Sequence, residues 1–298
     1  MTAAVKQTTG TRATMNRWIL SFWQSRPGRI GLIVLAGFVA VALAAPLIAD
    51  RVGLDTAVAR ANNVPLYGSP SEFPPLGTDH LRRSVWTQFV WGSRISLFVG
   101  LAATLVTIAL GSVIGIVAGF IGGRIEAVLM RLTEWFLVIP FLPLAIVLAS
   151  ILGRSIWNII FVIGVTSWPS TARLVRAQVL TVKQRLFVDR ARSLGAGGLH
   201  IVRRHILPNV SGLILANATL AVPISILTES TLSFLGLGDV RRPSWGKMLS
   251  EAFDASALTR NAWWYFLPPG AGIVLVVLAF TLIGQTLEQM ADPRLEKR

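Results

Sequence analysis

Side chains that could do chemistry are few and scattered in this sequence. It has no cysteine, which excludes disulfides, thiolate metal sites and a cysteine nucleophile. The three histidines, His80, His200 and His205, do not have metal-ligand spacing. His200 and His205 lie in a basic segment, where histidines contact solvent or lipid headgroups more often than they bind a metal. The only Gly-Lys pair, Gly246-Lys247, is followed by Met and forms no phosphate-binding loop. We therefore predict no catalytic residue, no metal site and no cofactor bound by this chain.

Two acids lie in or beside apolar stretches, where an unpaired charge is costly. Glu134 follows Arg131 by about one helical turn, a spacing that predicts an ion pair. Glu229 closes a long apolar run and stands just before Ser230 and Ser233. It could line a polar path through a membrane. Its place at the end of the run favours instead a structural cap or a hydrogen bond between subunits.

Polar side chains also occur inside that apolar run, at Asn217, Thr219 and Ser225, together with the helix-kinking Pro223. A helix that lines a translocation path needs such groups, so these three residues and Glu229 are our candidates for the path. Because polar side chains also join helices by hydrogen bonds, packing is the alternative.

A stripe of four glycines recurs at every fourth residue of an earlier apolar run. It consists of Gly111, Gly115, Gly119 and Gly123. Small residues at this spacing let two helices approach closely, so the stripe predicts helix packing and needs no ligand.

The composition indicates the solvent in which these elements fold. Of 298 residues, 53% are hydrophobic and 14% are charged, with a mean hydropathy of +0.63. So few charges cannot cover a soluble globule of this size, which points to lipid. The net charge of +14 is interrupted by long apolar stretches and forms no continuous basic face. We attribute it to membrane topology and contact with anionic lipid, and predict no nucleic-acid partner.

Six charge-poor stretches each have nearly, or more than, the roughly 20 residues that a helix needs to cross a bilayer. They are residues 30–49, 95–123, 135–153, 155–172, 206–228 and 261–287. The first is longer than a signal-peptide core and is predicted to be a retained span. The fourth is interrupted by Pro169, which we expect to kink it. The predicted fold class is an all-α integral membrane protein with about six transmembrane helices.

The distribution of basic residues predicts the orientation. With the N-terminus inside, 18 of the 28 Lys and Arg residues fall on the cytoplasmic side, so both termini are predicted to be cytoplasmic. The predicted parts are a cytoplasmic N-terminal segment (1–29), a first transmembrane helix (30–49), an extracytoplasmic loop (50–94), a five-helix core (95–290) and a cytoplasmic tail (291–298). The core contains a cytoplasmic loop (173–205) and an outside loop (236–260). Residues before Arg17 are expected to be disordered.

The cytoplasmic loop contains a short amphipathic pattern. Leu186, Phe187, Val188, Ala191 and Leu194 are predicted to lie on one side of a helix, with nothing of the chain's own beneath them. Charged residues lie elsewhere on it, and the glycines of 195–198 end it. The pattern alone favours equally a helix inserted into a groove of a cytoplasmic partner and a helix lying on the inner leaflet.

Several ordered motifs resemble those of one known family. Asp189-Arg190-Ala191-Arg192-Ser193-Leu194-Gly195-Ala196, followed by Ile206-Leu207-Pro208-Asn209, resembles the family's cytoplasmic loop, although the family motif opens Glu-Ala-Ala. Leu76-Gly77-Thr78-Asp79-His80-Leu81 resembles its outside motif, although Arg82-Arg83-Ser84 stands where Gly-Arg-Asp is usual. Further similar segments are Leu232-Ser233-Phe234-Leu235-Gly236-Leu237-Gly238, Pro243-Ser244-Trp245-Gly246, Trp263-Trp264, Pro269-Gly270 and Asp292-Pro293-Arg294-Leu295. With these motifs the chain resembles the permease subunits of binding-protein-dependent ABC importers of the dipeptide and oligopeptide type.

The resemblance implies the type I ABC importer permease fold and the second permease component of such an importer. It implies a coupling helix that docks on the ATPase and includes Leu186, Phe187, Asp189, Arg190, Ala191, Arg192, Leu194, Gly195 and Ala196. The implied partners are a second permease subunit in a heterodimer, two ATP-binding subunits that bind ATP and Mg, an extracytoplasmic solute-binding protein, membrane lipid and a peptide substrate. The implied location is the bacterial cytoplasmic (inner) membrane.

Three alternatives differ in function. The same fold serves importers of nickel and other small ligands. A self-contained channel or secondary transporter would be expected to show paired intramembrane charges or inverted repeats, and neither is evident in the sequence. A membrane enzyme would need clustered histidines, cysteines or acids at one depth, which the sequence does not provide.

Overall fold

The computed structural model describes residues 22–291, and regular structure in this range is helical apart from one isolated bridge between Thr78 and Ser84. The predicted all-α fold is thus confirmed. The elements are α2 (Arg26–Ile48), η1 (Arg51–Leu54), α3 (Thr56–Ala61), α4 (Val85–Ile121), α5 (Gly123–Val138), α6 (Phe141–Leu152), α7 (Ile156–Lys183), α8 (Leu186–Ser193), α9 (Gly198–Ile201), η2 (Val202–Ile206), α10 (Leu207–Phe234), α11 (Trp245–Asp254) and α12 (Trp263–Ala291). The expected disorder before Arg17 and the motif at 292–295 lie outside the described residues.

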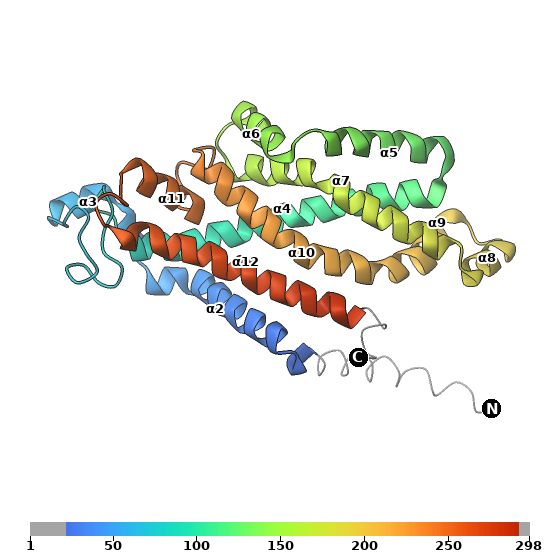
Figure 1. The fold of residues 1–298 in the computed structure, drawn as a ribbon, viewed down its shortest axis with the longest axis horizontal. Helices are drawn as coiled ribbons and strands as arrows, with labels where there is room; N and C mark the ends of the chain where they lie inside the picture. Colours follow the sequence, from blue (N-terminus) through green and yellow to red (C-terminus); the bar gives the residue numbers. More distant parts are fainter. Residues whose placement is uncertain (1–21, 292–298) are drawn as a thin grey trace.

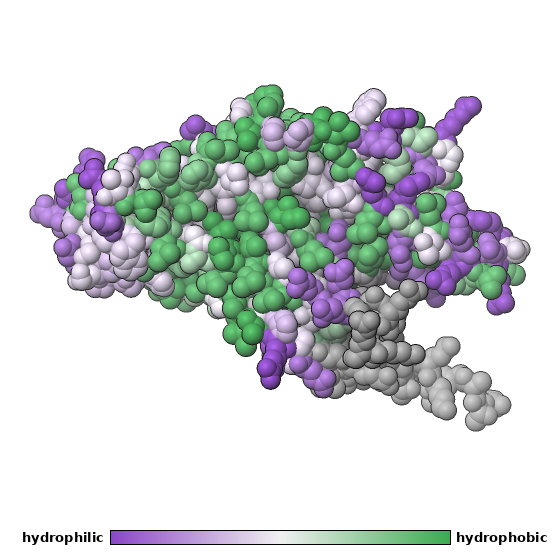
Figure 2. Space-filling model, viewed as in Figure 1, coloured by the Kyte–Doolittle hydropathy of each residue, from purple (hydrophilic) through white to green (hydrophobic). Residues whose placement is uncertain are grey.

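Four helical segments are long and apolar enough to cross a membrane, and a bent pair of helices makes a fifth candidate. They are α2, α4, the continuous run from α9 to α10, and α12, with α5 and α6 as the pair. α7 has 28 residues but is too polar to count among them. Because it packs along α4 (Figure 1), it completes a bundle of about six long segments. On the face shown in Figure 2, apolar side chains cover much of the middle of this bundle and hydrophilic side chains gather toward its two ends.

The stretch 135–153, predicted to be one span, does not form a single helix. The chain there forms α5 and α6, which are bent by 91°. The break falls at Ile139, which is extended at φ −72° and ψ 127°, and at Pro140. Proline has no N–H for the helical ladder and pushes the residue before it out of the helical region, so one helix ends and another begins.

Three helices run past the apolar stretches from which they were predicted. α4 begins ten residues before 95, α7 continues to Lys183, well past 172, and α10 ends at Phe234. The charged end of α7 is stabilised by its neighbours: Arg176 Nε donates to Glu126 Oε1 at 2.6 Å, and Lys183 Nζ donates to the Phe120 carbonyl at 2.6 Å. The expected loop at 173–205 is therefore largely helical, and the expected loops at 50–94 and 236–260 contain α3 and α11.

Four of the helices begin directly after a serine that caps their first turn. Ser25, Ser84, Ser155 and Ser244 each precede a helix and accept a hydrogen bond from a backbone N–H of its first turn. Asn158, a polar residue inside the fourth apolar stretch, donates to the carbonyls of Leu152 and Gly153 at 2.6 and 3.1 Å and so satisfies the end of α6.

The glycine stripe packs against α7, as predicted, at three of its four positions. A Cβ on Gly111, Gly115 or Gly119 would lie less than 3.0 Å from atoms of Thr171, Ala172 or Val179. Gly123 does not belong to this contact: it begins α5 with φ +60°, and no atom would lie within 4 Å of a Cβ there. The predicted ion pair of Arg131 and Glu134 is present at 3.7 Å.

Candidate translocation cavity and coupling segment

The segment predicted to be a coupling helix is α8, which lies with α9 at one end of the molecule, away from α3 and α11 (Figure 1). Its C-terminus closes as a Schellman motif. Gly195 has φ +82°, its N–H donates to the Arg192 carbonyl, and the N–H of Ala196 donates to the Ala191 carbonyl, both at 3.0 Å. The helix ends at this point because Gly195, which has no Cβ, adopts the left-handed backbone that the motif needs at little cost.

The expectation that nothing of the chain's own lies beneath α8 is wrong. Val188 is fully buried, and Ala191 and Ala196 pack beside it in a cluster formed with α7, η2 and α10. That cluster contains Val175, Val179, Val182, Ile201, Ile206 and Val210. α8 is therefore attached to the ends of two long helices by its inner face.

The outer face of α8 leaves apolar side chains uncovered. Leu186 is 74% exposed and Leu194 88%, and Phe187 is exposed as well. The predicted apolar side is thus divided between an inner face and an outer one. Leu199 of α9, which sequence reasoning did not select, is 66% exposed beside them, and the ring of His205 lies 6.0 Å from that of Phe187.

Charged residues surround this outer face. Asp189, Arg190 and Arg192 are exposed, and Asp189 and Arg192 form a loose ion pair at 3.9 Å. Apolar side chains bordered by exposed charges are typical of a surface that another protein covers.

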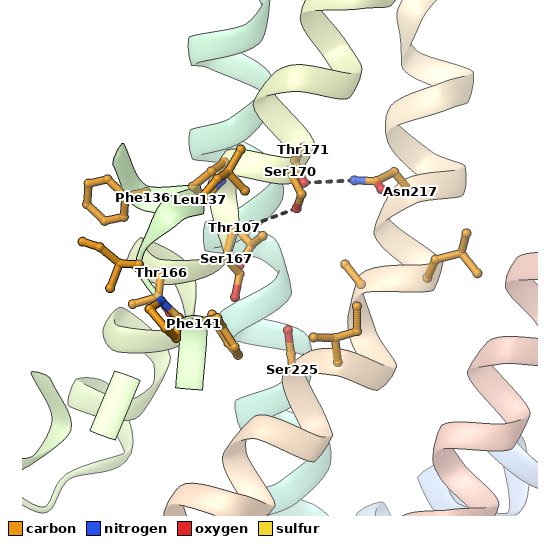
Figure 3. Close-up of a pocket in the computed structure, with 16 residues that line it drawn as sticks. Thr107, Phe136, Leu137, Phe141, Thr166, Ser167, Ser170, Thr171, Asn217 and Ser225 are labelled. Atoms are coloured by element: carbon orange, nitrogen blue, oxygen red, sulfur yellow. Dashed lines mark hydrogen bonds between the residues drawn. The ribbon is translucent and has the colours of Figure 1, made fainter. Parts of the chain in front are cut away.

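A cavity of about 350 Å³ lies where the α5–α6 bend faces α4, α7 and α10 (Figure 3). The apolar side chains of its lining, here called the apolar wall, come from the α5–α6 bend and from α10. They are Phe136, Leu137, Ile139, Pro140, Phe141, Leu220, Ala221 and Ile224. The bend at Pro140, which breaks the third predicted span, thus forms the α5–α6 part of this wall.

The other wall of the cavity is polar. It is formed by Thr107, Thr166, Ser167, Ser170, Thr171, Asn217 and Ser225, with Pro169. Asn217 Nδ2 donates to Thr171 Oγ1 at 3.0 Å, and Thr104 Oγ1 donates to Ser225 Oγ at 2.9 Å. The hydroxyls of Thr107 and Ser167 are buried and have no hydrogen-bond partner among the described residues. Such groups can bind water or a ligand that carries donors and acceptors.

The four candidates for the path separate in the structure. Asn217 and Ser225 line the cavity, whereas Thr219 and Glu229 do not. Thr219 donates to the Ala216 carbonyl at 2.7 Å and lies against Gly284 of α12. Glu229 is 1% exposed and accepts hydrogen bonds from Ser96, Ser230 and Ser233 of the same chain.

The motif at 76–81 fastens the loop before α4 to the end of the bundle that carries α3 and α11. Asp79 is fully buried and accepts from the backbone N–H groups of Leu81 and Arg83, from Arg83 Nε at 2.7 Å and from Gln88 Nε2 at 2.9 Å. Arg83 also contacts Glu251 of α11 at 2.5 Å. Burial lowers the pKa of Arg83, but the two carboxylates outweigh this and the pKa is raised, so the guanidinium keeps its charge. Arg83, which forms this clamp, corresponds to the arginine of the family's Gly-Arg-Asp, whereas Arg82 and Ser84 on either side of it are the residues that differ.

The motif at 243–246 joins α11 to α4 and α10. Trp245 is fully buried and stacks on Phe89 at 5.7 Å between ring centroids, and its Nε1 donates to the Phe89 carbonyl. A Cβ on Gly246 would lie 2.4 Å from the Ser230 carbonyl oxygen, so glycine is what allows this approach. These two family-like segments, at 76–81 and 243–246, therefore hold the loop before α4 and the helix α11 in place.

Comparison with known proteins agrees with this architecture. The family model described as binding-protein-dependent transport system inner membrane component matches residues 111–297. The dipeptide transport system permease protein DppC of Bacillus subtilis (strain 168) is 39% identical over 230 residues, which are 76% of this chain and 71% of the relative. The oligopeptide transport system permease protein OppC of the same strain is 34% identical over 292 residues, 96% of this chain and 93% of the relative. A putative peptide permease protein of Brucella suis biovar 1 (strain 1330) is 37% identical over 278 residues, 92% and 89% respectively. The chain therefore belongs to the family of inner membrane components of binding-protein-dependent transport systems.

Proposed function

We propose that this chain is a permease subunit of an ATP-driven importer of dipeptides or oligopeptides, that it forms half of the translocation path, and that α8 couples it to a separate ATPase. The observation that carries the coupling role is the division of α8 into a buried inner face at Val188 and an exposed apolar outer face at Leu186, Phe187 and Leu194. Peptide as substrate is supported by the names of the most similar relatives.

The proposed partners are a second permease subunit, two ATP-binding subunits that hold ATP and Mg, and an extracytoplasmic solute-binding protein. We assign no catalytic step to this chain. The excess of Lys and Arg on the side that carries α8 supports a cytoplasmic position for α8 and both termini, and an extracytoplasmic position for α3 and α11.

The cavity suits a peptide because of what its two walls offer. Serine, threonine and asparagine groups can bond the amides and carbonyls of a peptide backbone without selecting a sequence, while the apolar wall accepts varied side chains. Selection among peptides then resides in the solute-binding protein.

The coupling follows from how α8 is attached. Val188 belongs to the same buried cluster as Val179 of α7 and Val210 of α10, and these two helices contribute Thr171 and Asn217 to the polar wall of the cavity. A close-packed cluster transmits displacement rather than absorbing it, so movement of α8 with a closing ATPase pair shifts that wall. The result is alternating access between the two sides of the membrane.

The test compares Leu186→Asp with Leu258→Asp in the complete complex. Both leucines are 74% exposed, but Leu258 lies in the segment after α11 at the opposite end. We expect Leu186→Asp to abolish co-purification of the ATPase and ATP-driven uptake of a labelled dipeptide into proteoliposomes, and Leu258→Asp to retain the ATPase. Normal assembly and uptake by the Leu186→Asp complex would remove the coupling proposal. Uptake of nickel but not of any peptide by the wild-type complex would remove the substrate class alone.

A further inference from the structure

A second cavity, of about 750 Å³, lies at the end of the molecule that carries α3 and α11. It is enclosed by η1, the early turns of α4 and the segment that leads into α11. Four arginines, Arg51, Arg94, Arg241 and Arg242, line it, and all four are exposed. So many guanidinium groups around one hollow make it a site of strongly positive potential.

Little negative charge offsets these arginines. The lining acid Asp55 caps α3, where its Oδ1 accepts from the N–H groups of Ala57 and Val58 at 2.8 and 3.3 Å. Arg241 contacts Asp239 at 4.0 Å while its side chain stays 91% exposed. Within residues 22–291, no ion pair joins Arg51, Arg94 or Arg242 to a carboxylate. The cavity therefore favours an anion from outside the chain.

Two of the guanidinium groups lie against one aromatic ring that the fold holds in place. Arg51 Cζ lies 4.1 Å, and Arg94 Cζ 5.8 Å, from the ring centroid of Trp91. Trp91 is only 8% exposed, and its Nε1 donates to the Ala49 carbonyl at 2.9 Å. Guanidinium groups that line one cavity suit a phosphate, because each presents a planar set of donors that matches the phosphate oxygens.

The surroundings of Arg94 indicate the molecule that would carry the phosphate. Phe98, Leu101 and Leu105 follow Arg94 on one face of α4 and are 44%, 46% and 71% exposed. Trp157, which is 65% exposed, meets Phe98 edge-on at 6.0 Å. Tryptophan is enriched at the level of lipid headgroups, so Arg94 stands where an apolar, lipid-exposed stripe reaches the headgroup region.

We propose that this cavity binds the phosphate of an anionic phospholipid whose acyl chains lie along Phe98, Leu101 and Leu105. Arg94 and Arg242 would contact the phosphate from α4 and from the segment before α11, so that the lipid joins these two elements. The proposal depends on embedding in a membrane and is independent of the transported substrate.

The test titrates the purified complex in detergent with dioleoyl phosphatidylglycerol or dioleoyl phosphatidylcholine and counts bound lipids by native mass spectrometry. Wild-type complex is expected to prefer phosphatidylglycerol. Each arginine near an anionic lipid raises the affinity about fivefold, so the double variant Arg94→Gln with Arg242→Gln should weaken phosphatidylglycerol binding about 25-fold. The matched control, Arg60→Gln with Arg260→Gln, removes two exposed arginines of the same end that do not line the cavity and should leave binding unchanged.

Each other outcome contradicts the proposal in a distinct way. Equal binding of the two lipids by wild type, or an unchanged preference in the double variant, would overturn it. Displacement of phosphatidylglycerol by excess inorganic phosphate would make the cavity a site for free anions. Loss of solute-binding protein capture by the double variant with unchanged lipid binding would make it a protein contact. If the glutamine variant does not assemble, Arg94→Lys with Arg242→Lys replaces it, and loss of the two forks should still weaken binding severalfold.

Discussion

Ser96 Oγ in α4 donates a hydrogen bond to Glu229 Oε2 in α10 at 3.2 Å, and the same Oγ accepts the backbone N–H of Trp245 at 3.2 Å. One hydroxyl therefore connects three helices near the end of the bundle that carries α11. Ser233 Oγ donates to the other carboxylate oxygen at 2.8 Å, so an acid buried among apolar helices is satisfied inside its own chain. This arrangement gives Glu229 a structural position in the described residues.

Removing the Ser96 hydroxyl leaves the Trp245 N–H without an acceptor and deprives Glu229 of a donor. We expect Ser96→Ala to destabilise the complex by about 1–3 kcal/mol, the usual cost of a buried polar group left unpaired. A lower midpoint of thermal unfolding, followed by tryptophan fluorescence, measures this. Ser150→Ala is the control, because that exposed hydroxyl bonds only to the Ile146 carbonyl of its own helix. Equal midpoints for the two variants would contradict the structural role.

The contact of α4 with α7 gives a second prediction. A Cβ at Gly115 would lie 2.6 Å from the Ala172 carbonyl oxygen, whereas no atom would lie within 4 Å of one at Gly37 in α2. Gly115→Leu should therefore cost about 1–3 kcal/mol or more, because the two backbones must separate. We expect a lower yield of assembled complex in size-exclusion chromatography for Gly115→Leu. Gly37→Leu should match wild type, and the same loss in both would point to a general effect of bulk in the membrane.

The sequence predicted the features that depend on local chemistry. The end of α8 followed from Gly195, whose left-handed backbone costs glycine little, and the close approach of α4 to a neighbour followed from the spacing of Gly111, Gly115 and Gly119. The break at Pro140 had an equally local signal, the proline itself, which a count of apolar residues from 135 to 153 overlooks.

Features that depend on tertiary contacts could not be predicted in this way. Val188 and Leu194 both fit the apolar side of a short helix, and only the neighbouring helices decide that the first is buried and the second 88% exposed. For the candidate path residues in α10, the sequence could predict part of the outcome. Successive residues turn by about 100° around a helix axis, so Thr219 lies about 200° around the axis from Asn217, and Ser225 about 80°. Helical geometry alone therefore separates Thr219 from the other two.

The clamp between Asp79 and Arg83 gives a third prediction. Asp79 is fully buried, and its carboxylate accepts from two backbone N–H groups and two side chains. Asp79→Ala therefore leaves the Gln88 amide without this acceptor and leaves the Arg83 guanidinium with Glu251 alone. Breaking a buried ion pair from one side costs about 3–5 kcal/mol. We expect rapid cleavage of the loop before α4 in limited proteolysis from outside. Asp254→Ala, at an exposed carboxylate of the same end, should leave the loop protected, and protection of the loop in both variants would show that Asp79 does not hold it.

The cavity gives the last prediction, which separates transport from stability. Ser167 Oγ in the cavity wall and Ser112 Oγ outside it are both buried without a hydrogen-bond partner among the described residues. Removing a hydroxyl that bonds nothing in the resting chain should not lower stability, so we expect both Ser167→Ala and Ser112→Ala to unfold at the wild-type temperature or slightly above.

The rate of peptide uptake should distinguish the two variants. If a peptide backbone bonds to Ser167 as it passes, loss of one hydrogen bond worth about 0.5–1.5 kcal/mol should slow dipeptide uptake by roughly 2- to 13-fold in Ser167→Ala and leave Ser112→Ala at the wild-type rate. Equal uptake rates in the two variants, measured at the same ATPase rate, would mean that peptides do not contact this wall of the cavity.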